Sequence, residues 1–232
     1  MINSRKYRIA LVSALLGSSL AFSANAQSAT DSDLMSFFIT SVGKGDGANL
    51  GGLEGADAHC NALAAAAGSS KTWAAYLSTS AIIDRSDGTL KITDGVSARD
   101  RIGSGPWYNA VGELIAEDVD VLHAEDVNIN LETGLDENGK QIPGRGGQPN
   151  KHDILTGSDS AGHFSTAGGD TTCSNWTSNG DGSAIVGHHD RAGPSTARNF
   201  VSWNSSHGSR GCGETQLPLS GGAGLFYCFA VE

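Results

Sequence analysis

Apolar residues recur at helical spacing in one convincing stretch of the chain. The i, i+4, i+7, i+8, i+11 pattern places them on one buried stripe and predicts a helix. Gly68 follows the last of them, where a glycine commonly ends a helix. Cys60 lies on the stripe, so its partner is expected to come from the core. The stripe consists of Ala56, Cys60, Leu63, Ala64 and Ala67.

The other apolar segments are short and are separated by turn residues, which favours strands. Glycine supplies 32 of the 232 residues, about twice its usual share, so loops are expected to be long. With no internal repeat or linker, we predict one α+β domain over residues 37–232. Predicted strands cover 37–42, 72–79, 154–158, 171–176, 184–187, 200–203 and 224–231, with a weak hairpin over 81–95 and a short helix over 96–102.

The N-terminus has the pattern of an export signal. A basic start with Arg5, Lys6 and Arg8 precedes an apolar stretch and the small-x-small sequence Ala24-Asn25-Ala26. This order predicts a signal peptide over 1–26, followed by a disordered leader over 27–36. The apolar stretch is shorter than the roughly 20 residues that span a membrane. We therefore expect an exported protein in the periplasm, at the cell surface or outside the cell.

Charge limits the expected partners. The net charge is −10, and removing the three cations of residues 1–26 takes it to −13. Such a surface repels nucleic acid, anionic lipid and sulfated glycans. Nucleic acid and heparin-type polyanions are thus not expected as partners, and no later stretch is apolar enough for a membrane span.

The four cysteines are Cys60, Cys173, Cys212 and Cys228. An even set in an exported chain usually forms disulfides. No two of them form the close pairs that zinc sites favour. Four cysteines allow three connectivities, and spacing alone leaves all three open.

The stretch from Gly187 to Arg191 is the most chemically suggestive. Adjacent residues of an extended segment point to opposite faces, so only one of His188 and His189 can join a given site. His152 and His207 are possible distant partners, and zinc accepts such His and Asp ligands. The alternatives are an exposed loop or a histidine that orders a neighbouring loop through hydrogen bonds.

No catalytic residues are predicted. The aspartates form no recognisable general acid and base, and Ser205, Ser206 and His207 lack the strand–turn–helix context of a nucleophile. Arg99, Asp100 and Arg101 are expected to form salt-bridged supports.

The order of several short motifs resembles the C-type lectin-like fold, within it the endostatin domain of collagens and bacterial endostatin-like surface proteins. The matching segments are 72–79, 98–102 with Gly105-Pro106-Trp107, 154–162, Thr172-Cys173-Ser174-Asn175-Trp176 and Leu225-Phe226-Tyr227-Cys228-Phe229. The resemblance implies nested disulfides, Cys60–Cys228 around Cys173–Cys212. It also implies a domain whose usual work is binding, although the histidine cluster and clustered arginines of endostatin are absent here.

Sugar-binding C-type lectins hold calcium with a Glu/Gln-Pro-Asn/Asp loop and a later Trp-Asn-Asp. The corresponding residues here give a candidate ligand set of Gln148, Asn150, Trp203 and Asn204. Ser205 stands where the lectins have Asp, whereas calcium prefers carboxylate oxygens. The alternative is a proline turn, with Trp203 in the core. The candidate metal ligands are Gln148, Asn150, Asn204, His188 and Asp190, with calcium as a possible cofactor.

We therefore expect a non-catalytic, secreted or surface-exposed module that binds a protein or neutral glycan through its long loops. The alternative is a zinc- or calcium-dependent extracytoplasmic enzyme that uses the His188–Asp190 region.

Overall fold

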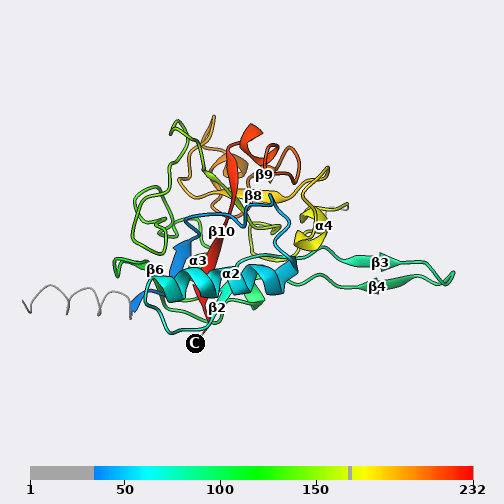
Figure 1. Ribbon diagram of the computed structural model, residues 1–232, viewed down its shortest axis with the longest axis horizontal. Coiled ribbons are helices and arrows are strands. Elements are labelled where there is room, and N and C mark those ends of the chain that lie inside the picture. The colour runs from blue at the N-terminus through cyan, green and yellow to red at the C-terminus, as the bar shows by residue number, and fades with distance from the viewer. Residues whose placement is uncertain (1–33, 167–168, 232) are drawn as a thin grey trace, which may run out of the picture.

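The computed structural model describes residues 34–166 and 169–231 (Figure 1). The predicted signal peptide lies outside the described residues, as does the leader up to residue 33. The described chain is a mixed α+β structure with one long helix. Its elements are β1 (Phe37–Ile39), α2 (Gly52–Ala66), β2 (Trp73–Ala75), β3 (Ile82–Asp84), β4 (Lys91–Thr93), η1 (Ala98–Asp100), β5 (Trp107–Tyr108), β6 (Leu114–Ala116), α3 (Val119–Leu122), β7 (Asp153–Leu155), α4 (Cys173–Trp176), β8 (Ile185–His188), α5 (Arg198–Val201), β9 (His207–Gly208), η2 (Leu217–Leu219) and β10 (Gly222–Ala230).

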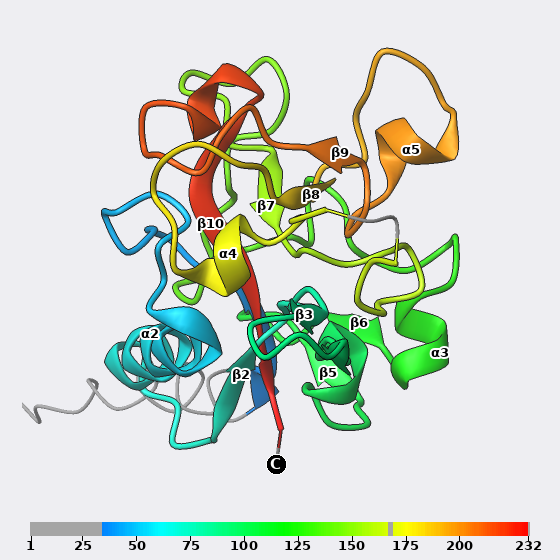
Figure 2. The ribbon, with the colours of Figure 1, turned by 90° about the vertical axis from the view of Figure 1, so that its right-hand side faces the viewer.

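The C-terminal strand β10 is the centre of the main sheet, whose order is β1-β10-β7-β8-β9. Its last residues pair antiparallel with both β1 and β2, and its first half pairs parallel with β7. Figure 2 shows β10 in red along the whole sheet, with α2 beside one end and β7, β8 and β9 at the other. The sheet therefore joins the two ends of the described chain and carries β7–β9 at a distance from α2.

The alternation of side chains along β10 divides the core into two clusters. Phe226 and Cys228 pack in one cluster with Trp73 and the buried stripe of α2. Tyr227 and Phe229 point to the other face and pack with an aromatic group that includes Trp107. Both faces of the strand are buried, which explains why its sequence is a continuous apolar run.

The predicted helix is confirmed. Ala56, Cys60 and Ala64 are its buried residues, and Leu63 and Ala67 are partly buried against the same cluster. Gly68 adopts a left-handed φ of 92° at the end of the helix, the role that its position predicts.

The nested pairing of the cysteines is also confirmed. Cys60 on α2 bonds to Cys228 on β10 across 168 residues, and Cys173 bonds to Cys212 across 39. All four cysteines are fully buried. Two disulfides are typical of proteins that fold in an oxidising, extracytoplasmic compartment.

Two predicted strands are wrong. Residues 200–203 overlap the short helix α5, and residues 171–176 overlap the helical turn α4. In α4 the residues from Cys173 to Trp176 have left-handed φ values of 49–66°. The disulfide at Cys173 and the bond from Trp176 Nε1 to the Ser78 carbonyl, 2.8 Å, hold this turn in the core. Long-range contacts, which local pattern does not record, decide both segments.

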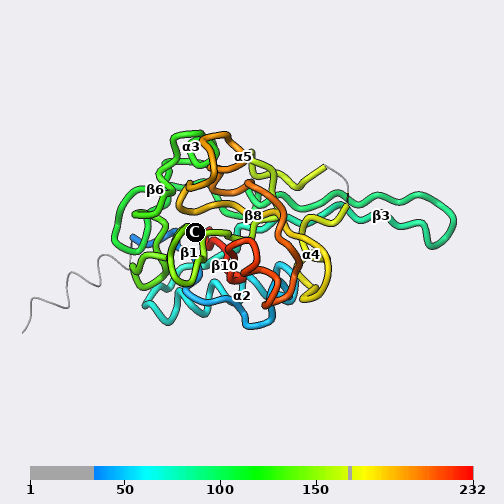
Figure 3. Tube along the Cα trace, turned by 90° about the horizontal axis from the view of Figure 1, so that it is seen from above, coloured from blue at the N-terminus to red at the C-terminus, as the bar shows by residue number. Residues whose placement is uncertain are grey.

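The hairpin β3–β4 projects from the body of the protein (Figure 3). Its predicted turn at Asp87-Gly88 is confirmed, since Ile83 pairs with Ile92 across it. Both isoleucines are exposed. No helix among the described residues is long and apolar enough to cross a membrane.

Candidate functional site

Four polar side chains meet where β7, β8 and β9 lie side by side. Asp153 opens β7 and pairs in register with His188, the last residue of β8. His207 opens β9 and pairs with Val186, two residues from His188. Because residues two apart in a strand share a face, this register brings Asp153, His188 and His207 to one side of the sheet. His152 immediately precedes β7, and its ring stacks on that of His188 at 4.2 Å.

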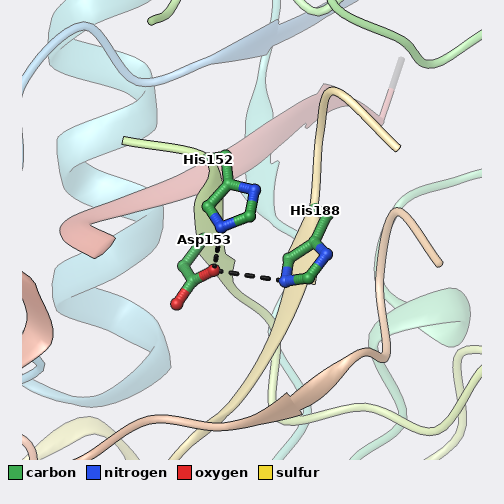
Figure 4. Close-up of side chains that lie close together, drawn as sticks. All are labelled: His152, Asp153 and His188. Carbon is green, nitrogen blue, oxygen red and sulfur yellow. Dashed lines mark ion pairs between the residues drawn. The ribbon is translucent and has the colours of Figure 1, made fainter. Parts of the chain in front are cut away.

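The inner atoms of this cluster are close together, and Figure 4 shows three of its members, His152, Asp153 and His188. Asp153 Oδ1 lies 3.1 Å from His152 Nε2, 3.3 Å from His188 Nε2 and 3.6 Å from His207 Nε2. The Nε2 atoms of His188 and His207 are 3.0 Å apart. The side chain of His207 is 35% exposed, whereas the other three are almost completely buried. The cluster thus reaches the surface through His207.

The outer nitrogen of each histidine faces an oxygen. His188 Nδ1 donates to the Phe200 carbonyl at 2.8 Å, and His207 Nδ1 lies 3.1 Å from the Gly208 carbonyl. His152 Nδ1 lies 3.3 Å from Asp190 Oδ1. Because a carbonyl can only accept, the Nδ1 atoms of His188 and His207 carry a proton and their Nε2 atoms face the centre. The ring of His152 lies between two carboxylates, Asp190 at Nδ1 and Asp153 at Nε2.

Asp190 anchors the loop that follows β8. Its carboxylate also accepts from the backbone N–H groups of Arg145 and Ala192. Burial would raise the pKa of this carboxyl, but the hydrogen bonds from His152 and the backbone outweigh it and lower the pKa to about 2. Asp190 is therefore a carboxylate at neutral pH.

His188 and His189 have opposite environments. Burial lowers the pKa of His188, but the contacts with Asp153 and the Phe200 carbonyl outweigh it and give a net upward shift. Burial lowers the pKa of His189 to about 4. The side chains of the two adjacent histidines thus lie on opposite faces, as predicted for an extended segment. Of the two, only His188 belongs to the cluster.

A cavity of about 330 Å³ lies between the loop after β8 and the segment around His123. Its floor includes Trp203 and Asn204, both buried, and its rim includes the exposed Arg198. Asn204 Nδ2 donates to the Tyr76 hydroxyl at 2.9 Å, and that hydroxyl donates to His123 Nε2 at 2.7 Å. The polar floor is therefore held in place by the protein's own hydrogen bonds.

One loop, residues 189–206, connects the cluster to the cavity. Phe200 contacts His188 through its carbonyl, and its neighbours Arg198 and Val201 line the cavity. Arg191 also lines the cavity, and it donates at 2.6 Å to the carbonyl of Glu125, another lining residue.

The predicted ligand residues lie in different places. Trp203 and Asn204 are in the floor of this cavity, whereas Asn150 lines a separate cavity of about 400 Å³ beside Pro149 and Leu217. Gln148 is exposed. The carboxamide of Asn204 is occupied by internal hydrogen bonds, including 3.0 Å to the Ser202 hydroxyl.

The predicted metal residues are likewise divided. His188 lies in the cluster, and Asp190 contacts its outer edge through His152. Sequence reasoning named His152 and His207 only as distant partners and missed Asp153. The available signal was the pair His152-Asp153 directly before an apolar run, at the entrance of a strand. No protein-family model matches the chain, and a search of curated proteins finds no similar sequence.

Proposed function

We propose that the protein is an extracytoplasmic, non-catalytic binding module that receives part of a neutral glycan in the cavity beside loop 189–206. The observation that carries this proposal is the buried floor of Trp203 and Asn204 beneath a rim of longer polar side chains. Such a combination of apolar surface and a few fixed polar groups is typical of ligand pockets, and the volume of the cavity is at the lower end of their range.

The chemistry of the rim suits hydroxyl groups. Arg191 and Arg198 supply donors, Glu125 supplies an acceptor, and Thr196 can do either. A sugar presents donors and acceptors together, so this mixed rim fits it better than a single-sign surface would. The resemblance to C-type lectin-like domains supports the same proposal, because loops on a rigid scaffold serve recognition in many folds.

A glycan array, accompanied by a panel of extracellular matrix proteins, tests this proposal. We expect at least one neutral glycan to bind, and Arg198→Ala to weaken that binding because the rim loses one of its two arginine donors. Arg85→Ala is the matched control, since Arg85 is an exposed arginine next to β3 in the projecting hairpin. A wild-type protein that binds nothing on the array and the panel, or a variant pair with equal loss, would overturn the proposal.

The second candidate is a metal-dependent enzyme that uses the His188–Asp190 region, and the cluster of imidazoles around Asp153 favours its metal component. Catalytic zinc ions usually keep three protein ligands and one open position. Here four side chains approach one centre, an arrangement that favours binding over catalysis. Hydrolase activity that disappears on chelation and returns with metal would make the enzyme the favoured candidate.

A further inference from the structure

The inner atoms of the cluster pose an electrostatic problem. The Nδ1 atoms of His152, His188 and His207 all face acceptors, so their Nε2 atoms and the Oδ1 atom of Asp153 are directed into one small space. Four electron-rich atoms in a mostly buried place repel one another unless a positive charge lies between them. That charge can come from added protons or from a metal ion.

Protons alone leave Asp153 unsatisfied, because the hydrogen bond among the inner atoms joins the Nε2 atoms of His188 and His207 at 3.0 Å and does not serve the carboxylate. Both carboxylate oxygens of Asp153 are buried, and neither has a donor in hydrogen-bonding geometry among the described residues, although three Nε2 atoms lie within 3.6 Å of Oδ1. An Nε2–H group serving Asp153 would point at its oxygen. None of the three nitrogens satisfies Asp153 in this way, whereas the ligand atoms of His152, Asp153 and His188 lie close enough together to share one ion.

We propose that His152, Asp153, His188 and His207 bind one zinc ion through their Nε2 and Oδ1 atoms. With zinc–ligand bonds of about 2.0–2.1 Å, a tetrahedral site has ligand atoms about 3.3–3.4 Å apart. Four of the six separations among these atoms are 3.0, 3.1, 3.3 and 3.6 Å, which bracket this value.

The surroundings of the four side chains fit metal ligation. Histidine ligands usually donate their other ring nitrogen to a carboxylate or a carbonyl, which fixes the tautomer. His152 has Asp190 in this position, His188 has the Phe200 carbonyl, and His207 has the Gly208 carbonyl. The charges of Asp153 and Asp190 together balance a divalent ion.

The donor set selects zinc over calcium. Calcium prefers six to eight oxygen ligands, and this site offers three imidazoles and one carboxylate. Imidazole suits zinc and copper, but a tetrahedral arrangement favours zinc. Among the described residues, no other group of three histidine, cysteine or acidic side chains approaches so closely.

The ion would close loop 189–206 at its base. His188 immediately precedes this loop and His207 immediately follows it, so one ion would join both ends and add β7 through Asp153. A link between the ends of a long loop reduces its freedom in the unfolded chain. The zinc is thus a structural crosslink that supports the wall of the cavity, an inference that stands whether or not the cavity binds a glycan.

The test uses the full oxidised protein and measures metal directly. Elemental analysis should find one zinc ion per chain, and chelation should lower the Tm by about 5 °C or more. After zinc is exchanged for cobalt, the visible absorption should have the intensity of a tetrahedral complex. These measurements on the wild type need no variant that might misfold.

Three variants then locate the site. His207→Ala should abolish the cobalt spectrum and the effect of chelation, and it should fold because its side chain is partly exposed on the edge strand β9. Asp190→Asn leaves all four proposed ligands in place but weakens the support of His152 and the carboxylate's bonds to the backbone of Arg145 and Ala192, and it should weaken zinc binding by about 10–100-fold. His163→Ala is the control, because this histidine has a 51% exposed side chain outside the cluster. The inference would be overturned if the purified protein contained no zinc and its Tm did not change on chelation. Equal metal binding by wild type and His207→Ala would overturn it as well.

Discussion

The outer disulfide should contribute more stability than the inner one, although both are fully buried. The comparison requires two variants, Cys60→Ala/Cys228→Ala and Cys173→Ala/Cys212→Ala. Each removes the same two sulfur atoms from the same cluster of buried residues. Their losses of packing should therefore be similar, and the difference between them should reflect mainly the length of chain that each bridge closes.

Loop-closure entropy gives the magnitudes. The inner bridge closes 39 residues, which corresponds to about 4 kcal/mol. The outer bridge closes 168 residues, but the inner bridge removes 39 of them, which leaves an effective loop of about 129. This loop corresponds to about 5 kcal/mol, so the two variants should differ by about 1 kcal/mol.

Urea unfolding at neutral pH, followed by tryptophan fluorescence and circular dichroism, measures both free energies of unfolding. The two probes should coincide if unfolding is two-state. We expect both variants to be strongly destabilised, the outer one more. Equal stability of wild type and the outer variant would refute the reasoning, as would a larger loss on removing the inner bridge.

Three further perturbations test other parts of the structure. Burial lowers the pKa of His123 in the folded protein below its ordinary 6.5. The stability contributed by the neutral imidazole is therefore present above pH 6.5 and is lost as the pH falls towards the folded pKa. The Tm of the wild type should drop over this range more steeply than that of His123→Gln. Gly187→Ala would place a methyl group against the Trp203 carbonyl. It should lower the free energy of unfolding in urea by about 3 kcal/mol or more. Gly180→Ala is the control, because its methyl group would enter open space, and it should change the free energy of unfolding by less than about 0.5 kcal/mol. Asp57→Asn should lower the free energy of unfolding by about 2 kcal/mol in the same assay. The reason is that Arg101, whose side chain is only 13% exposed, donates to both Asp57 oxygens, at 2.9 and 2.7 Å. An unchanged urea midpoint would show that this ion pair contributes no stability.

The elements that could be predicted from sequence are those whose burial follows a simple pattern of apolar residues along the chain. The apolar residues of α2 recur at helical spacing and β10 is a continuous apolar run, so the sequence predicts both the helix that buries Cys60 and the strand over 224–231 that carries Cys228. The salt-bridged supports are confirmed for Arg99 and Arg101, which pair with Asp120 and Asp57.

The failures have one physical cause. Segments 171–176 and 200–203 are apolar enough for strands, but their conformations follow from distant partners. A disulfide and the Ser78 carbonyl fix the first, and bonds from His188 to the carbonyls of Phe200 and Ser202 fix the second. No local pattern contains those contacts.

The cluster of histidines shows the same limit in the functional site. His188 was singled out because its neighbours are chemically distinctive, whereas Asp153 looked like the polar entrance to an apolar strand. Only the register between β7 and β8 places Asp153 opposite His188. Sequence could therefore supply the types of ligand but not the set that meets.

The disulfides and the proposed zinc ion would hold different parts of the fold. The outer disulfide joins α2 to β10, and the inner one joins α4 to the segment after β9, so neither lies within loop 189–206. That loop has 18 residues and contains only the four-residue helix α5, and loops of this length are uncommon without a functional reason. Its ends are held where His188 and His207 meet Asp153. If zinc provides that link, the disulfides set the stability of the whole domain, and the ion sets the order of the loop that forms one wall of the cavity. Loss of zinc should then affect the ligand site before it affects the fold.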